Sequence, residues 1–338
     1  MGARGLSFVQ YGKETIATHG TAVAATKILA GAEIKGVPVD RKPEFIEDAL
    51  GVRARSARVV TYETLVEDTL SVPNAYFQCL PLFFSLGLKG NVTASETTAS
   101  QQDYAWAFTP SMTASNTLDS ATLEFGDGDQ EYECEYTMFK NLKVKGTIDQ
   151  GGGASPVSIE GQYFARQMTP STKTAALSLP TMTTMNAKNA RLYKDTAWAG
   201  KGATEVTAIL REFEFEIMTG VHPKFFGDAN KYFATHGEDR IDAMLTLLLE
   251  HGSSAHAFYT DWQAGTAKAY AIKIAGPQIG SGTTHALNMF MWGVVESVIP
   301  ISSESNGNNL TAVVIHGTYD TTGAQIVDVN VTTNANAI

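Results

Sequence analysis

One stretch of the sequence carries acidic side chains at a spacing that could do chemistry. Within residues 123–146, Asp127 and Asp129 flank Gly128, so a metal loop, a catalytic carboxylate pair and a plain turn are all open. A calcium loop of the EF-hand type needs glycine at position six and glutamate at position twelve, and "DGDQEYECEYTM" has neither. Asp-Gly between two apolar runs favours a tight hairpin turn, so we predict a β-hairpin here.

Beyond this turn, acids alternate with apolar residues, as side chains do on the two faces of a strand. The second half of the chain repeats the pattern around residues 212–217. An ordinary solvated sheet face explains such a pattern, but three like charges on one strand repel one another, and the repetition invites a functional interpretation. The predicted acidic faces are Glu131, Glu133 and Glu135, opposite Tyr132, Cys134, Tyr136 and Met138, and Glu212, Glu214 and Glu216, opposite Phe213, Phe215 and Ile217.

Histidines cluster in sequence between residues 236 and 256, which raises the question of a metal or catalytic site. The apolar spacing predicts a helix over residues 237–252, which would hold His236 and His251 about 20 Å apart. No His-Glu-x-x-His, phosphate-binding loop or Gly-x-Ser-x-Gly motif occurs. We therefore predict no catalytic residue, no metal ligand and no cofactor, and hence no enzyme.

The composition is that of a folded globular protein. The chain has 338 residues, 43% hydrophobic and 18% charged, and no apolar run approaches the roughly 20 residues of a membrane helix. Its formal net charge of -10 repels phosphate, which disfavours ordinary nucleic-acid binding. Cys79 and Cys134 are the only cysteines, which indicates a reducing compartment and two buried thiols.

The order of predicted elements is similar in the two halves. Residues 9–39, rich in Gly, Ala and Thr, predict an extended N-terminal arm, and residues 42–51 and 75–86 predict helices. Residues 91–103 form a polar loop, and several short β-rich runs follow it. The same order of β, helix and several strands after residue 186 predicts a duplication, with domains at residues 1–185 and 186–338.

Several of these segments together resemble one protein family. "TLDSATLEFGDGDQEYECEYTMFKNLKVKG" (residues 117–146) resembles the central strand and hairpin of the tail tube proteins, or major tail proteins, of long-tailed bacteriophages. "NARLYKDTAWAGKGATEVT" (189–207) is similar to the junction in their longer, two-domain members. "YGKETIATHGTAVAATKIL" (11–29) and "HGTYD" (316–320) are similar to their N-terminal arm and last strand.

This resemblance implies a mainly β fold with two tandem tail-tube domains, each a β-sandwich or partial barrel with a flanking α-helix. It implies a structural virion protein whose copies form trimeric, pseudo-hexameric rings that stack into the hollow tail tube. The expected partners are further copies of itself, the tape-measure, tail-terminator and distal tail proteins, and DNA that passes without sticking, with no membrane contact. The expected location is the virion tail, assembled in the host cytoplasm.

The six glutamates of the two acidic strand faces are the predicted lumen-facing residues, since an acidic wall repels DNA. Residues before Ser56 and the polar loop at 91–103 are expected to bridge successive rings. Two other functions stay open on the sequence: a capsid or decoration subunit of a virion, and, less favoured, a soluble hydrolase that uses the region of His236 to His256.

Overall fold

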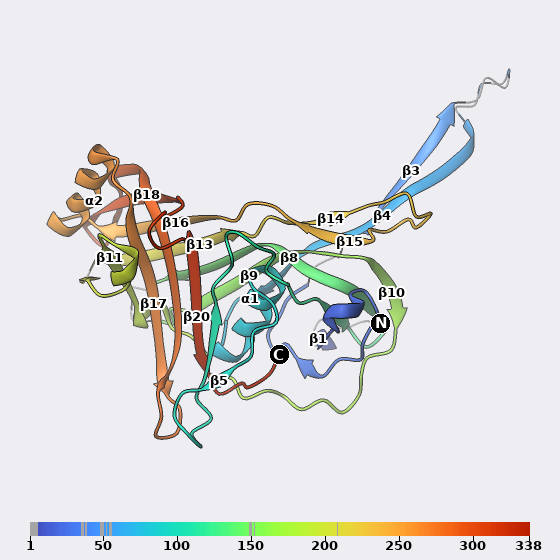
Figure 1. The fold of residues 1–338 in the computed structure, drawn as a ribbon, viewed down its shortest axis with the longest axis horizontal. Helices are drawn as coiled ribbons and strands as arrows, with labels where there is room; N and C mark the ends of the chain where they lie inside the picture. Colours follow the sequence, from blue (N-terminus) through green and yellow to red (C-terminus); the bar gives the residue numbers. More distant parts are fainter. Residues whose placement is uncertain are drawn as a thin grey trace.

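The computed structural model describes residues 6–34, 37, 39–47, 51, 53, 56–148, 151, 153–207 and 209–338. The molecule is elongated, with strands at both ends and a helix, α1, between them (Figure 1). A long ribbon, β3–β4, projects from one end, and the helix α2 lies at the other. The mainly β class predicted from the sequence is confirmed by the strands that make up most of the described chain.

The chain forms two α-helices and twenty strands in its described part. The helices are α1 (Leu80–Gly87) and α2 (Ser253–Ala264). The strands are β1 (Phe8–Lys13), β2 (Lys27–Ile28), β3 (Val39–Glu47), β4 (Ser56–Val72), β5 (Ser95–Glu96), β6 (Tyr104–Phe108), β7 (Ala121–Gly126), β8 (Glu131–Thr147), β9 (Val157–Ala165), β10 (Gln167–Ser171), β11 (Ala190–Asp195), β12 (Glu205–Val206), β13 (Leu210–Met218), β14 (Val221–Lys224), β15 (Thr235–Glu238), β16 (Asp242–Glu250), β17 (Lys268–Gln278), β18 (Thr284–Ser305), β19 (Asn308–Gly317) and β20 (Val327–Thr333).

Two sets of strands share one pattern of antiparallel pairing. In the first set, which we call the first repeat (β1–β4 and β7–β10), β1 pairs with β2 and β7, β8 pairs with β7, β9 and β10, and β4 pairs with β3 and β9. In the second repeat (β11–β13 and β16–β20), β11 pairs with β12 and β17, β18 with β17, β19 and β20, and β16 with β13 and β19. In each repeat the helix follows the strand that corresponds to β4.

The repeats are joined edge to edge. β8 of the first repeat pairs with β13 of the second, from Glu212 opposite Thr147 to Met218 opposite Asn141. β6 pairs with β20 in the same way, with Phe108 opposite Val329. One hydrophobic cluster also runs through both repeats. Because strands from both sides of the predicted boundary at residues 185 and 186 share one sheet, the division into two separate domains stays a prediction.

The predicted N-terminal arm contributes to the sheet and to the hydrophobic core. Its first part is β1, which pairs with β7 along its whole length, and Val9 and Tyr11 are buried in the main hydrophobic cluster. Burial does not alternate along β1, so its sequence lacks the period of two that would have predicted a strand. The later part of the segment lies on the sheet through hydrogen bonds described below.

Two of the three predicted helices are strands. Residues 39–47 form β3, while residues 48–50 of the helix predicted over 42–51 lie outside the described residues. The helix predicted over residues 237–252 is mostly β16, in which burial alternates along the strand. Ala243, Leu245, Leu247 and Leu249 point into the core, so the leucine-rich run satisfies a period of two as well as a helical one. Pairing with β13 and β19 decides between the two.

The apolar helix predicted over residues 75–86 is confirmed in its second part. A 3-10 turn at Phe77–Cys79 leads into α1, and every residue of α1 is buried. Pro81 stands in the first turn, where its missing N–H leaves no broken hydrogen bond, so this proline is compatible with the helix. Cys79 and Cys134 are both free and buried, and burial raises the pKa of the Cys79 thiol to about 12.

The predicted facing of β8 holds only as far as residue 135. Tyr136 has a φ of 57°, and the register with β7 shifts there, so the strand contains a bulge. Cys134 packs in the main cluster, whereas Tyr136 and Met138 pack on the other side of the strand with Phe164 and Phe233. The prediction that all four apolar residues of 132–138 share one face is therefore wrong.

Candidate functional site

The Asp127-Gly128-Asp129 stretch is the predicted turn of a β-hairpin. β7 and β8 pair up to Gly126 opposite Glu131, and Gly128 takes a φ of 84°, which suits glycine. The Asp127 carboxylate accepts a hydrogen bond from the N–H of Asp129 at 3.2 Å and lies 3.5 Å from that of Gln130. This carboxylate therefore stabilises the turn, and the hairpin prediction is confirmed.

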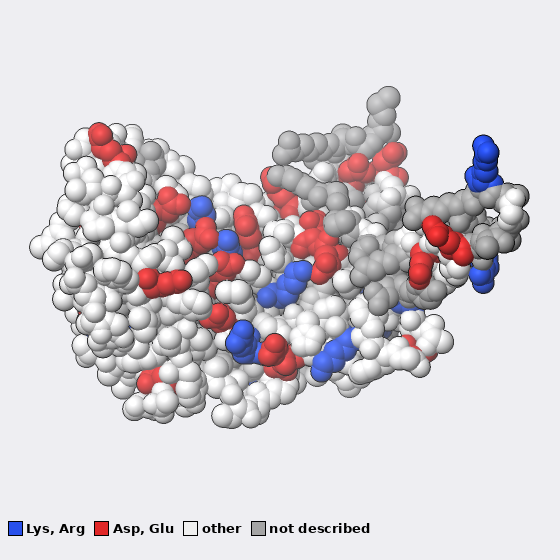
Figure 2. Space-filling model, turned by 90° about the horizontal axis from the view of Figure 1, so that it is seen from above, with Lys and Arg blue, Asp and Glu red and all other residues white. Residues whose placement is uncertain are grey.

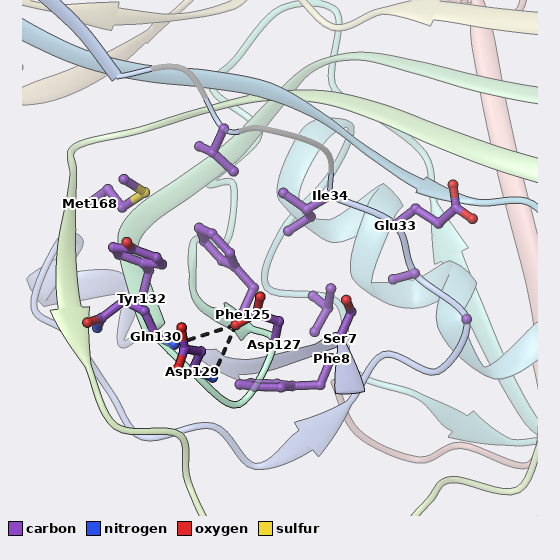
Figure 3. A pocket seen from close by; sticks show the side chains of 15 residues that line it. Ser7, Phe8, Glu33, Ile34, Phe125, Asp127, Asp129, Gln130, Tyr132 and Met168 are labelled. Atoms are coloured by element: carbon purple, nitrogen blue, oxygen red, sulfur yellow. Dashed lines mark hydrogen bonds between the residues drawn. The ribbon is translucent and has the colours of Figure 1, made fainter. Parts of the chain in front are cut away.

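A pocket of about 980 Å³ lies beside this turn, between the start of β1 and residues 31–34 and 37 (Figure 3). Phe8, Phe125, Tyr132 and Met168 give it apolar walls. The acids at its border do not converge on one point: Asp127 and Asp129 stay on the turn, while Glu33 lies on the opposite side. Throughout the described part of the chain, no group of three or more His, Cys, Asp or Glu side chains is placed to hold a metal ion.

The first acidic face is not an open surface. The Glu131 carboxylate accepts the N–H of Lys173 at 2.6 Å, and the Glu133 carboxylate accepts the Ser171 hydroxyl at 3.0 Å. Glu135 is buried, with 6% of its surface exposed. Burial raises the pKa of Glu135 above its ordinary value, against a smaller lowering by a hydrogen bond from Gln167. These acids hold β10 and the chain that follows it against β8.

Two further buried glutamates, which we did not single out from the sequence, fix the N-terminal segment on this sheet. Glu14 accepts the N–H groups of Gly20 and Tyr136 at 2.7 Å each and the hydroxyls of Ser120 and Thr122. Glu124 accepts the N–H groups of Ala25 and Thr174. Glu124 stands within the apolar run of β7, and this position in the sequence could have indicated a buried carboxylate. The carboxylates replace water for the backbone donors of the covering segment.

The second acidic face is a ladder of ion pairs between the two repeats. Lys143 of β8 lies 2.9 Å from Glu214 and 3.7 Å from Glu216, and Lys145 lies 3.4 Å from Glu212 and 3.5 Å from Glu214. Burial pushes the pKa of Glu214 upward, but the hydrogen bond and charge of Lys143, helped by Lys145, outweigh it and leave that pKa lowered. The hydrogen bond that Lys143 donates to Glu214 likewise raises the pKa of Lys143.

The six predicted glutamates therefore occupy two different settings. The first three lie beside β10 and the residues that follow it, which donate hydrogen bonds to Glu131 and Glu133. The second three lie on β13 beside Lys143 and Lys145. The molecule seen from above carries acidic and basic groups interspersed rather than one acidic field (Figure 2). Sequence reasoning missed the lysines because the pairing of β8 with β13 joins residues about seventy positions apart.

His19, Ser120, Glu14, Tyr136 and His236 form a polar cluster beneath the covering segment. The His19 Nδ1 atom is 2.6 Å from the Ser120 hydroxyl, which donates to the Glu14 carboxylate at 2.6 Å. The serine thus stands between histidine and acid, whereas an activated nucleophile needs the histidine in the middle. Burial lowers the pKa of both imidazoles below the ordinary value. The cluster is suited to holding the N-terminal segment in place through hydrogen bonds.

The other histidines of the predicted cluster are spread out. The Nδ1 atom of His251 is 2.9 Å from the Thr311 hydroxyl, and the ring of His256 stacks on Tyr259 within α2. His236 instead meets the Tyr136 hydroxyl at 3.1 Å. The structure brings His236 next to His19, with the ring centroids 5.7 Å apart. The helix from which we predicted a separation of His236 and His251 is mostly strand β16.

No protein-family model matches the chain, and no curated protein is significantly similar to it. None of the described helices is long and apolar enough to cross a membrane.

Proposed function

We propose that this chain is a structural virion protein whose copies form stacked rings and so build the hollow tail tube of a long-tailed bacteriophage. The supporting observation is the shared pairing pattern of the two repeats together with their edge-to-edge joint through β8 and β13. A unit that already joins its own repeats head to tail can join further copies in the same manner. Head-to-tail contacts between identical chains generate closed rings or helical filaments.

The resemblance of residues 117–146 and 189–207 to tail tube proteins agrees with this architecture. The repeats are the proposed tail-tube domains, so three copies in a ring supply six similar units with pseudo-sixfold symmetry. The tape-measure, tail-terminator and distal tail proteins are the proposed further partners, and the virion tail, assembled in the host cytoplasm, is the proposed location. The proposal assigns the chain no enzymatic activity.

The proposed lumen wall is the face with Glu212, Glu214 and Glu216. Lys143 and Lys145 reduce its charge, but three acids face two lysines, and the whole chain carries a net charge of -10. A weakly acidic wall repels the DNA backbone and offers few sites where it would stick. Glu131, Glu133 and Glu135 are weaker candidates, because their carboxylates are engaged with Lys173, Ser171 and the surrounding sheet.

The first test is negative-stain electron microscopy of the purified full-length protein over a concentration series. We expect rings with three large lobes, or hollow tubes that lengthen with concentration. Closed shells or isolated trimers without tubes would favour a capsid or decoration subunit instead. A monodisperse monomer at every concentration, together with a bound metal found by elemental analysis, would overturn the proposal in favour of a hydrolase.

A further inference from the structure

One face of the second repeat is partly exposed, whereas the corresponding face of the first repeat is covered by another segment of the chain. In the first repeat, Tyr136, Met138 and Phe164 lie on the outer side of β8 and β9 and are at most 2% exposed. They are covered by a ribbon inserted between β13 and β16 of the second repeat, formed by β14, β15 and the connecting residues 225–234, which we call the β14–β15 ribbon. Its Phe233 ring lies 4.9 Å from the Tyr136 ring and 5.3 Å from the Phe164 ring. This is a contact of one repeat's ribbon with the other repeat's sheet.

The positions that correspond to this face can be identified by register. β8 has an extra residue, Lys140, between the pairs Phe139–Tyr163 and Asn141–Gln162. β18 has an extra residue, Glu296, between the pairs Val295–Ile315 and Ser297–Val314. Aligning the two bulges matches Tyr136, Met138 and Phe164 of the first repeat with Trp292, Val294 and His316 of the second.

The matching residues of the second repeat are partly open. Trp292 and Val294 are half-buried, and the His316 side chain is 46% exposed. From residue 294 onward, β18 pairs with β19 on one edge, and no described strand pairs with its other edge. On β8, the corresponding edge is paired with β13. Ile299 and Ile301 farther along β18 are more than half exposed.

The ribbon that would cover this face also exists in the chain, but at the opposite end of the molecule. The register of β3 with β4 is the same as that of β13 with β16 and of β14 with β15 in the second repeat. In order, the pairs Asp40–Leu65, Pro43–Thr61 and Phe45–Val59 correspond to Met218–Asp242, Val221–Glu238 and Pro223–His236. β3–β4 is thus the first repeat's counterpart of the β14–β15 ribbon. It projects away from the body, and Phe45 and Val59 on it are 54% and 56% exposed (Figure 1).

We propose that a second copy of this chain lays its β3–β4 ribbon across Trp292, Val294 and His316 of the first copy. The contact repeats between chains the one that β14–β15 makes within a chain. By this correspondence Val59 takes the position of His236, which meets the Tyr136 ring, and so lies against Trp292 of the neighbouring copy. Since ribbon and face lie at opposite ends of one chain, the contact is head to tail and can propagate.

The inference rests on the self-association in the proposed function, but it requires only two copies in contact and no stacked tube. Its test is crosslinking of two full-length variants, Val59→Cys and Val294→Cys, mixed in equal amounts with a short bis-maleimide. The natural cysteines are buried, so the introduced thiols are the reactive ones. We expect a covalent dimer in the mixture, linked between residues 59 and 294 by mass spectrometry.

The matched control replaces Val59→Cys by Leu179→Cys, since Leu179 is 70% exposed and lies outside the ribbon. A yield no higher than this control, or a Val59→Cys preparation that crosslinks to itself equally well, would overturn the proposal. Tubes in the microscope without this crosslink would reject the interface and keep the proposed function. The crosslink without rings or tubes would keep the interface and reject the tube.

A second measurement does not depend on crosslinking. Phe45→Asp places a charge on the ribbon at an exposed position, so the fold and the thermal midpoint should not change. In sedimentation velocity, we expect the wild-type chain to form assemblies and the Phe45→Asp variant to sediment as a monomer. Phe226→Asp is the matched control, because Phe226 is 60% exposed but does not belong to β3–β4. Equal assembly of both variants would contradict the proposed contact.

Discussion

The Nζ atom of Lys143 lies 2.9 Å from the carboxylate of Glu214, and this ion pair joins the first repeat to the second. The two residues are on adjacent strands, β8 and β13, and Glu214 stands directly opposite Lys145 in the register. Lys143 therefore contacts Glu214 diagonally across the strand pair. Each of the two lysines lies within ion-pair distance of two glutamates. The acidic face predicted from the sequence is thus part of the joint between the repeats.

This ladder predicts a coupling between the two repeats that salt weakens. Lys143→Met and Glu214→Gln should each lower the free energy of unfolding by up to about 1 kcal/mol, the range of half-exposed ion pairs. The double variant should lose less than the sum of the two, since each change removes the same pair. Urea unfolding of the four proteins at low and high salt measures this coupling, and additive losses at both would contradict it.

Glu14 is predicted to be essential for fixing the N-terminal segment. Both of its carboxylate oxygens accept two hydrogen bonds, and an amide nitrogen in Glu14→Gln cannot accept any. We expect a loss of about 2–3 kcal/mol in the free energy of unfolding, because buried donors lose a charged acceptor.

Glu96→Gln is the control for this change. Glu96 accepts one hydrogen bond from the N–H of Gln102 at an exposed site, so its replacement should change the free energy of unfolding little. Chemical denaturation of the two variants under the same conditions makes the comparison. Equal stability of Glu14→Gln and the wild type would show that the network does not fix the segment.

Phe233→Ala should detach the β14–β15 ribbon from the first repeat. Phe233 is fully buried against Tyr136 and Phe164, and loss of such a ring leaves a cavity that costs about 3–5 kcal/mol. Hydrogen exchange should speed up in β14 and β15 first, since Phe233, together with Val221 and the partly buried Phe225, supplies the apolar contacts that hold these strands on the first repeat. Phe226→Ala, at an exposed position of the same ribbon, should leave exchange unchanged, and matching exchange rates in both variants would refute this role.

His316 predicts a small dependence of stability on pH. Its Nε2 atom is 2.9 Å from Asp242, and this hydrogen bond, against some burial, raises the pKa of the imidazole above its ordinary value. The pair therefore stabilises the folded chain below the ordinary histidine pKa, and that contribution is lost as pH rises through the raised folded pKa. Because His316 is half exposed, the change should be about 0.2–1 kcal/mol.

The matched variant is His316→Gln, which keeps a polar side chain but does not titrate. The difference in thermal stability between wild type and variant should shrink as pH rises from acidic values past neutrality. A difference that is constant with pH would mean that the imidazole does not titrate in contact with Asp242 and Glu296, the two acids that face it.

The sequence alone determined the class of the fold and the local turns. Alternating apolar residues predicted a mainly β chain, and Asp-Gly between apolar runs predicted the β7–β8 hairpin. These features depend on residues close together in the chain, where backbone geometry acts directly.

The tertiary structure decided what no local pattern contains. β16 is a strand because it fits between β13 and β19, although its leucines also satisfy a helical period. Glu212, Glu214 and Glu216 meet lysines because β13 pairs with β8, and Glu135 is buried because β10 lies beside it. Packing between distant segments likewise leaves the β3–β4 ribbon exposed and the face with Trp292, Val294 and His316 partly exposed. Long-range pairing sets which side of a strand meets water, and the sequence pattern by itself gives only the alternation.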